Sequence, residues 1–161
     1  MTEEPEKRET VPPLQSRLED PVDAVRLGAL AEIFLAGSAS LPDTKLLAKC
    51  LDDPSHDVRG MAVQTLALGG VNAVEPLAES LSDRQPTPVR IASAMALGKL
   101  GPDAAPAVDR LRRCLDSHDD ALRWQACFAL AKIGAEAIPA LIDTLASPAT
   151  RTASAAANAL E

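Results

Sequence analysis

The chain has 161 residues, 47% of them apolar and 24% charged, which is the composition of a folded globular protein and excludes a wholly disordered one. Its net charge of −7 disfavours a protein that follows nucleic-acid phosphates, because such proteins normally present a basic surface. Aromatic residues make up only 2% of the chain, and the bias toward alanine and leucine favours helices over strands.

The N-terminal segment, residues 1–12, is polar and charged, and we expect it to be a disordered tail ahead of a repeat domain at 13–161. It lacks the apolar stretch of a secretory signal. No apolar run approaches the ~20 residues of a membrane-spanning helix. We therefore expect a cytoplasmic protein with no membrane association, in which the three cysteines are reduced.

A motif of two leucines four residues apart, preceded by a proline, returns along the chain with spacings of 30 to 34 residues. Proline is tolerated in the first turn of a helix, so each motif predicts a short helix, which we call helix B. A polar turn follows each second leucine. The leucine pairs are Leu14/Leu18, Leu47/Leu51, Leu77/Leu81, Leu111/Leu115 and Leu141/Leu145.

A second helix, helix A, is predicted after each polar turn and can be counted from an arginine near its start. Small or apolar residues stand three and seven positions after that arginine, on one helical face. A glycine stands eleven positions after it, where a helix can end with a positive φ. The arginine and glycine of each copy are Arg26 and Gly37, Arg59 and Gly70, Arg90 and Gly101, and Arg123 and Gly134.

These elements predict an all-α, right-handed solenoid of about five two-helix repeats. Helix A has almost no polar face, as in the stretch 58–70, so it must be covered on most sides. The chain opens with helix B at 13–18 and closes with helix A at about 148–160. That last helix is rich in Ala, Ser and Thr, so it can cap the stack, or the chain can be a piece of a longer solenoid.

The repeat resembles the short HEAT-like repeats first noticed in bilin-lyase proteins, over about residues 13–160. Tetratricopeptide repeats need aromatic residues that this chain nearly lacks, and the Thr-Pro-Leu-His of ankyrin repeats is missing. The resemblance is carried by the recurring aspartate, Val-Arg, alanine, leucine and glycine of helix A, followed by the proline and leucine pair of helix B.

In that family an aspartate and an arginine of each turn form a hydrogen-bonded ladder from repeat to repeat, and the resemblance implies such a ladder here. The fourth copy departs from the pattern with Ser117 in place of aspartate, and the fifth has Ala153 in the arginine register. The residues assigned to the ladder are Asp20, Asp53, Asp83, Arg26, Arg59, Arg90 and Arg123.

The two histidines do not form a shared site. His56 stands three positions before its repeat's arginine and His118 stands five before, so their registers differ. They also lie two repeats apart at about 10 Å per repeat, whereas a metal needs bonds of about 2 Å. We expect both to be solvated turn residues or helix caps.

The sequence gives no basis for an enzyme. Cys50 and Cys114 share a register two repeats apart, too far for a disulfide, and core packing is expected for them and for Cys127. HEAT-like iron hydroxylases hold metals with His-Glu pairs, which this sequence lacks, and no residue set identifies a bilin lyase. We therefore expect no catalytic residues, no cofactor and no metal.

Two surfaces are candidates for partner binding. The B helices carry charges of both signs, which form either a solvated face or, at the basic cluster 110–113, a contact for an acidic protein segment. Positions two, six and nine after the arginine of helix A are predicted to face outward, where an apolar stripe can bind a partner, form a homodimer or be covered by the N-terminal segment. Trp124 stands one position after its arginine, and we expect it to pack between repeats rather than to form an exposed binding hot spot. The candidate residues are Lys45, Lys49, Glu75, Glu79, Arg110, Arg113, Leu35, Met61 and Leu68.

The expected function is a non-enzymatic scaffold or adaptor that docks another protein, with no nucleic acid or membrane as partner. The alternative is an accessory or regulatory subunit of an enzyme system, such as a bilin-lyase-like protein, or a repeat domain of a larger protein. Both rest partly on the analogy between repeat folds.

Overall fold

A computed structural model describes residues 12–146 of the chain. This part is all-helical and contains no strand. The expected tail at 1–12 falls almost wholly outside the described residues, and the expected last helix at 148–160 does so entirely. The elements are α1 (Leu14–Leu18), α2 (Asp23–Ala36), η1 (Ser38–Ser40), α3 (Thr44–Lys49), η2 (Cys50–Asp52), α4 (His56–Ala67), α5 (Val71–Glu79), α6 (Thr87–Leu100), η3 (Gly101–Ala107), α7 (Val108–Cys114), α8 (Asp120–Ile133), η4 (Ala135–Ala137) and α9 (Ile138–Ala146).

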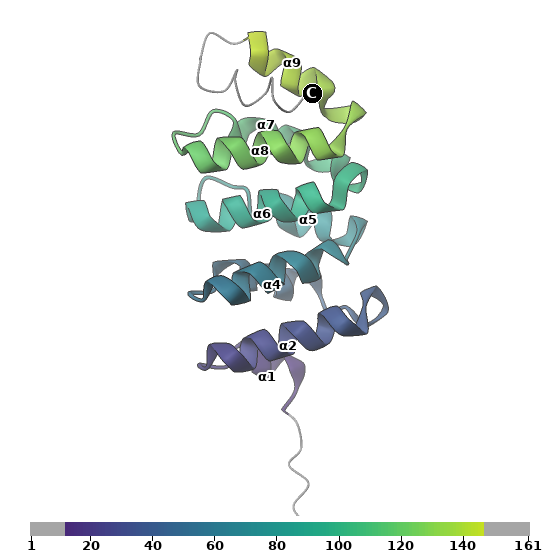
Figure 1. Cartoon of the computed structure of the whole chain (residues 1–161), viewed down its shortest axis with the longest axis vertical. Coiled ribbons are helices and arrows are strands. Elements are labelled where there is room, and N and C mark those ends of the chain that lie inside the picture. Colours follow the sequence, from purple (N-terminus) through teal and green to yellow (C-terminus); the bar gives the residue numbers. More distant parts are fainter. Residues whose placement is uncertain (1–11, 147–161) are drawn as a thin grey trace, which may run out of the picture.

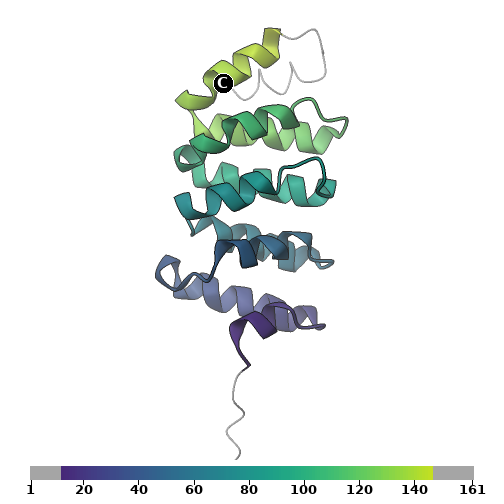
Figure 2. The same cartoon turned by 180° about the vertical axis from the view of Figure 1, so that it is seen from behind.

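The helices form two layers in a stack of two-helix repeats, which confirms the predicted solenoid. The A helices α2, α4, α6 and α8 lie side by side in the layer nearest the viewer in Figure 1. The shorter B helices form the layer seen in front when the molecule is turned around (Figure 2). We call the outer surfaces of these layers the A face and the B face. None of the described helices is long and apolar enough to cross a membrane.

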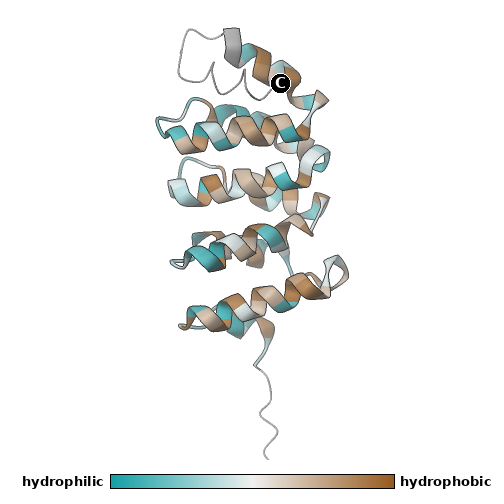
Figure 3. Cartoon of the chain, viewed as in Figure 1, coloured by the Kyte–Doolittle hydropathy of each residue, from teal (hydrophilic) through white to brown (hydrophobic). Residues whose placement is uncertain are grey.

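The core lies between the two layers and is built from the predicted leucines. Small residues three positions after each arginine are fully buried, as are most of the larger ones seven positions after it, because this face of helix A meets helix B. Figure 3 shows apolar residues along the lengths of the A helices and polar ones mostly near their ends. The core leucines with 0% exposure include Leu30, Leu47, Leu51, Leu66, Leu77, Leu97, Leu111, Leu122 and Leu130.

The predicted glycine turns are confirmed. Gly37, Gly70, Gly101 and Gly134 have φ values of 78°, 52°, 60° and 84°, in the left-handed region that a residue with a Cβ rarely adopts. Within the described residues no other kind of residue has a positive φ. The glycines therefore turn the chain from helix A back toward helix B in each repeat.

The proline prediction is wrong for Pro76, which is the sixth residue of α5 rather than part of its first turn. Helix α5 begins earlier, at Val71, directly after a glycine turn. A proline inside a helix leaves the carbonyl four residues before it without its N–H partner. Here that carbonyl, of Asn72, accepts a hydrogen bond from Thr44 Oγ1 at 3.1 Å, so the preceding helix B satisfies it.

Neighbouring A helices approach closely at small residues. A Cβ added to Gly98 of α6 would lie 3.2 Å from the Cα of Ala129 and 3.4 Å from its Cβ, both on α8. Buried hydroxyls in this layer are satisfied locally, since Thr65 and Ser93 each donate to a carbonyl four residues earlier in the same helix. The stack is thus tight between A helices, while the edges of the B helices leave hollows.

Candidate functional site

Three hollows follow one another along the B face, each between two consecutive B helices and next to the turn that leads to helix A. The first groove lies between α1 and α3, the second between α3 and α5, and the third between α5 and α7. Lys49 and Asp52 line both the first and the second groove, and Glu79 lines both the second and the third. Because they share walls, the grooves form one track across three repeat boundaries, which we call the B-face track.

The third groove is the largest of the three, at about 470 Å³, and it is lined by four arginines against two acids. Arg84 and Arg113 are exposed and have no ion-pair partner among the described residues. Their guanidinium groups can form paired hydrogen bonds with a carboxylate, which a lysine cannot do in the same geometry.

Arg110 reaches across from α7 to α5, where its Nη2 donates to Glu75 Oε1 at 2.9 Å. Its Nη1 is buried and has no hydrogen-bond partner among the described residues. An unsatisfied buried donor is costly, so this guanidinium has hydrogen-bonding capacity left for an acceptor that enters the groove.

The structure brings most of the charged candidates together. Lys45, Lys49 and Glu79 line the second groove, while Arg110, Arg113 and Glu79 line the third. Glu75 does not line a groove but holds Arg110 in place. These six residues therefore belong to one surface, as the mixed-sign face of the B helices predicts, and the hollows and their shared walls are what the structure adds.

The turn arginines hold their own turns through backbone carbonyls. Nη1 of Arg26, Arg59 and Arg123 donates to the carbonyl six residues earlier, at 2.7, 2.7 and 2.6 Å. Arg90 differs, since its Nε donates to Leu81 O nine residues earlier at 3.1 Å. The recurring register of these arginines is thus explained by a carbonyl contact within each repeat, besides any contact between repeats.

One ion pair joins two successive repeats in the way the ladder implies. Arg26 of α2 donates to both carboxylate oxygens of Asp53, at 2.6 and 2.8 Å, and the two side chains are only 10% and 8% exposed. Desolvation raises the pKa of Asp53, but the hydrogen bonds from Arg26 and from the Ser55 backbone N–H together lower it by more. The pKa of Asp53 is therefore below the usual aspartate value.

The ladder does not continue in this form through the third and fourth copies. Arg90 pairs with Asp83 at 2.7 Å and Arg123 with Asp120, each within its own repeat. The third turn is one residue longer, so Asp83 is 92% exposed and Arg84 stands in the register that Asp20 and Asp53 occupy. The side chain of Asp20, in the first copy, accepts from the Val22 backbone N–H and caps its own turn.

The predicted outward register of helix A is wrong for most copies of positions two and six but correct for most copies of position nine. Positions two and six after the arginine are mostly buried, because they face the neighbouring A helix, while positions five and nine are exposed in both α6 and α8 and position one is exposed in α8. Leu35 is exposed, but Met61 packs against the core and Leu68 is half-buried. Of these three residues only Leu35 is exposed, so the structure does not show the predicted stripe, and the homodimer stays a prediction.

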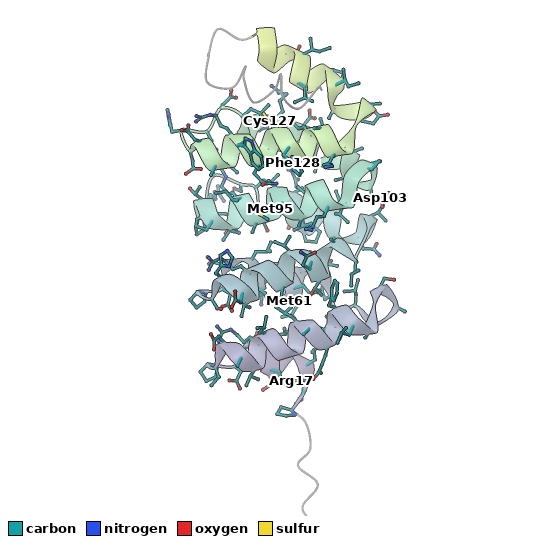
Figure 4. The ribbon with its side chains drawn as sticks, viewed as in Figure 1. Arg17, Met61, Met95, Asp103, Cys127 and Phe128 are labelled. Carbon is teal, nitrogen blue, oxygen red and sulfur yellow. The ribbon has the colours of Figure 1, made fainter. Side chains whose placement is uncertain are left out.

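A different apolar group is exposed on the A face, and it includes Trp124, predicted to pack between repeats. Trp124 is 57% exposed and its ring stacks on Phe128 with centroids 5.5 Å apart. Lys132 Nζ lies 5.3 Å from the centroid of the Phe128 ring. Figure 4 shows Phe128 on α8 and Met95 on the neighbouring α6, on the side toward the viewer. The outward register of α8 explains the failed prediction.

The three cysteines belong to the core, as the sequence predicts, and Cys50 also lines the first groove of the track. All three thiols are free and buried, and burial raises the pKa of Cys50 and of Cys127 to about 11, so these thiols stay protonated at neutral pH. His56 is exposed beside Asp57, at 3.7 Å. Within residues 12–146 no group of three or more His, Cys, Asp or Glu could hold a metal ion.

Comparison with known proteins decides the family. A model of HEAT repeats matches residues 44–108 and, in overlap, residues 74–161, which together exceed half of the chain. The chain belongs to the HEAT-repeat family. No curated protein is a significant match to this HEAT-repeat chain.

Solved structures support the same fold. The complex of CpcE and CpcF of phycocyanin lyase from Nostoc sp. PCC7120 matches with a TM-score of 0.65 and 19% identity, over 92% of this chain and 96% of that chain. A designed armadillo-repeat protein in complex with the peptide (KR)4 matches with a TM-score of 0.53 and 21% identity, over 92% and 80%. A structure of tubulin recruitment by microtubule polymerases with TOG domain arrays matches with a TM-score of 0.59 and 16% identity, over 91% and 38%.

Proposed function

We propose that this HEAT-repeat protein is a non-enzymatic scaffold whose B-face track docks an extended segment of another protein. The observation that carries the proposal is the continuity of the three grooves, which share Lys49, Asp52 and Glu79 as common walls. A surface that crosses three repeat boundaries suits an extended chain better than a small molecule, because each hollow alone is open and shallow.

The repeat-protein structures that resemble the chain support this proposal by what they contain. One was solved with a bound peptide, one is a complex of two proteins, and one concerns the recruitment of tubulin. In this chain, the free cations of the track supply the charges that would steer and orient a partner.

The proposal is tested by capturing partners from an extract of the source cells with the wild-type chain and two charge-reversal variants. The track variant carries Lys49→Glu and Arg113→Glu. The control carries Lys99→Glu and Lys132→Glu, which change the net charge equally but lie on the A helices. All four side chains are exposed, so both variants are expected to fold.

A protein that the wild type and the control retain, and that the track variant loses, supports the proposal. Equal capture by all three chains would mean that partners bind elsewhere, and capture of nothing would count against a scaffold. Isothermal titration with the identified partner then measures the loss, and circular dichroism of both variants checks their folding.

A second candidate function is that of an accessory subunit in an enzyme system of the bilin-lyase kind. It is supported by the phycocyanin-lyase complex, since the match covers 96% of a chain that is one component of a two-protein assembly. Co-purification of the chain with a coloured ligand or with a second repeat protein would favour this candidate over a general adaptor.

A further inference from the structure

The charge of the B-face track changes sign along the solenoid. The first groove is lined by Glu19, Asp20, Asp52 and Asp53 against Arg26 and Lys49, which leaves an excess of two acids. The second groove has two cations and two acids. The third has four arginines against Glu79 and Asp83, an excess of two cations.

This polarity remains when groups already paired within the protein are set aside. In the first groove the Arg26–Asp53 pair cancels, which leaves three acids against Lys49. In the third groove Asp83 neutralises Arg90 and Glu75 neutralises Arg110, which leaves Arg84 and Arg113 against Glu79. The first groove is therefore acidic and the third basic even after the internal ion pairs are counted.

A local sequence change creates the basic end. Arg84 stands six residues before the arginine of its repeat, where the first two turns carry an aspartate, and it lines the third groove. The same residue therefore ends the aspartate ladder and adds a cation to the track. Arg113, on the exposed side of α7, adds the second free cation.

The two ends act independently on a bound segment. Consecutive repeats lie about 10 Å apart, so the first and third grooves are separated by roughly 20 Å. That distance is about two and a half times the Debye length of about 8 Å at physiological ionic strength, so exposed charges at one end are screened from the other. Each groove thus attracts the charge opposite to its own excess.

We propose that the partner segment is zwitterionic in blocks, with an acidic stretch over the third groove and a basic stretch over the first, so that the track fixes its direction along the solenoid. An extended chain spans about 3.3–3.6 Å per residue, so roughly six residues separate the centres of the two blocks. This inference rests on the proposed docking function and specifies the chemistry of the partner.

The test uses fluorescein-labelled synthetic peptides of identical composition that differ only in charge order. Two peptides carry an acidic block and a basic block about six residues apart, one in each chain direction, and a third has the same charges in alternation. Fluorescence anisotropy measures their affinities, and a benzoylphenylalanine beside the acidic block maps its position by photo-cross-linking. We expect one block peptide to bind about tenfold more tightly than the alternating peptide and its acidic end to cross-link to α5 or α7.

A gain of binding separates this inference from simple loss of folding. Arg84→Glu with Arg113→Glu makes the third groove acidic like the first, so a peptide with basic blocks at both ends should replace the zwitterionic one as the tightest ligand. Lys99→Glu with Lys132→Glu changes the charge equally on the A helices and should leave the preference unaltered.

The outcomes distinguish the inference from the proposed function. Equal affinity of block and alternating peptides, with cross-links inside the track, would overturn the charge polarity but leave the docking track intact. An acidic block that cross-links to α1 or α3 would also overturn it. If no peptide binds, the inference fails, and the partner capture with the Lys49 and Arg113 variant decides the docking function by itself.

Discussion

Arg26, in helix α2, donates hydrogen bonds to both carboxylate oxygens of Asp53, which lies in the turn before α4. Among residues 12–146 this is the ion pair that joins the turns of two successive repeats. The same guanidinium also donates from Nη1 to Asp20 O, so one side chain fixes its own turn and the next. Within the described part of the chain, the side chain of Arg59 donates only within its own turn, to Asp53 O and Pro54 O.

These contacts predict that Arg26→Ala destabilises the protein more than Arg59→Ala. Loss of the Arg59 contacts leaves turn carbonyls unpaired and should cost about 1–3 kcal/mol. Loss of Arg26 adds an uncompensated, largely buried carboxylate at Asp53. Urea unfolding of both variants measures the difference, and equal midpoints would show that the inter-repeat pair adds nothing.

The same ion pair predicts a loss of stability in acid. The pKa of Asp53 is lowered in the folded chain, since the hydrogen bonds from Arg26 and Ser55 outweigh desolvation. The unfolded chain therefore takes up the proton first, and the contribution of Asp53 is complete above about pH 4 and is lost as the pH falls through the lower folded value. Melting temperatures of the wild type and Asp53→Asn should converge over this range, and a constant difference would contradict the assignment.

Much of the fold could be predicted because each repeat has the same structural requirements, so the same residue types recur at the same positions. Each glycine eleven residues after the arginine is needed for a positive φ, and the leucine pairs 47/51, 77/81 and 111/115 fill the space between the layers. Such patterns can be aligned within one chain. Helix starts were less predictable, since Pro76 is accommodated inside α5 by a hydrogen bond from Thr44, a residue of another repeat.

The site was predictable only in part. A sequence shows which residues are charged, but it does not show the grooves between B helices that these residues line. Lys49 and Arg113 are recognisable as exposed cations, but their membership of one track depends on hollows between B helices. The outward register of helix A depends on which side meets the next A helix. The sequence therefore predicts a packed Trp124 and an outward Met61, whereas in the structure Trp124 is exposed and Met61 packs against the core.

The close approach of α6 and α8 predicts that Gly98→Ala is destabilising although alanine favours helices. The new Cβ would lie 3.2 Å from the Ala129 Cα, a backbone atom that can move only if the helices separate. Overpacking of this kind costs about 1–3 kcal/mol, against a propensity gain of about 1 kcal/mol. Thermal unfolding should show a net loss.

Gly60→Ala is the matched control, since Gly60 is also in an A helix but has nothing within 4 Å of a new Cβ. Alanine there should stabilise the chain by about 0.5–1 kcal/mol. A gain at both positions would show that the A helices are not tightly packed at Gly98.

The buried thiols predict slow modification in the folded state. Cys50, Cys114 and Cys127 are buried, and burial raises the pKa of each. The reactive thiolate is therefore scarce at neutral pH and inaccessible. Ellman's reagent should react with the chain at the rate of unfolding, and with three equivalents at once in denaturant. A fast native equivalent would place one thiol at the surface.

The stacked pair Trp124 and Phe128 predicts a fluorescence signal that reports on the A face alone. Trp124 is the single tryptophan of the sequence, and its exposure should make it readily quenched by acrylamide in the native state. Phe128→Ala removes the stacked ring and should shift the emission further to the red and increase quenching, with a change in stability of about 0.5–1.5 kcal/mol. Peptides that bind in the B-face track should leave this emission unchanged, because the track lies on the other layer of helices. A change in tryptophan emission on peptide binding would place the peptide on the A face instead, and protection of Trp124 from acrylamide in the free chain would mean that this ring is covered.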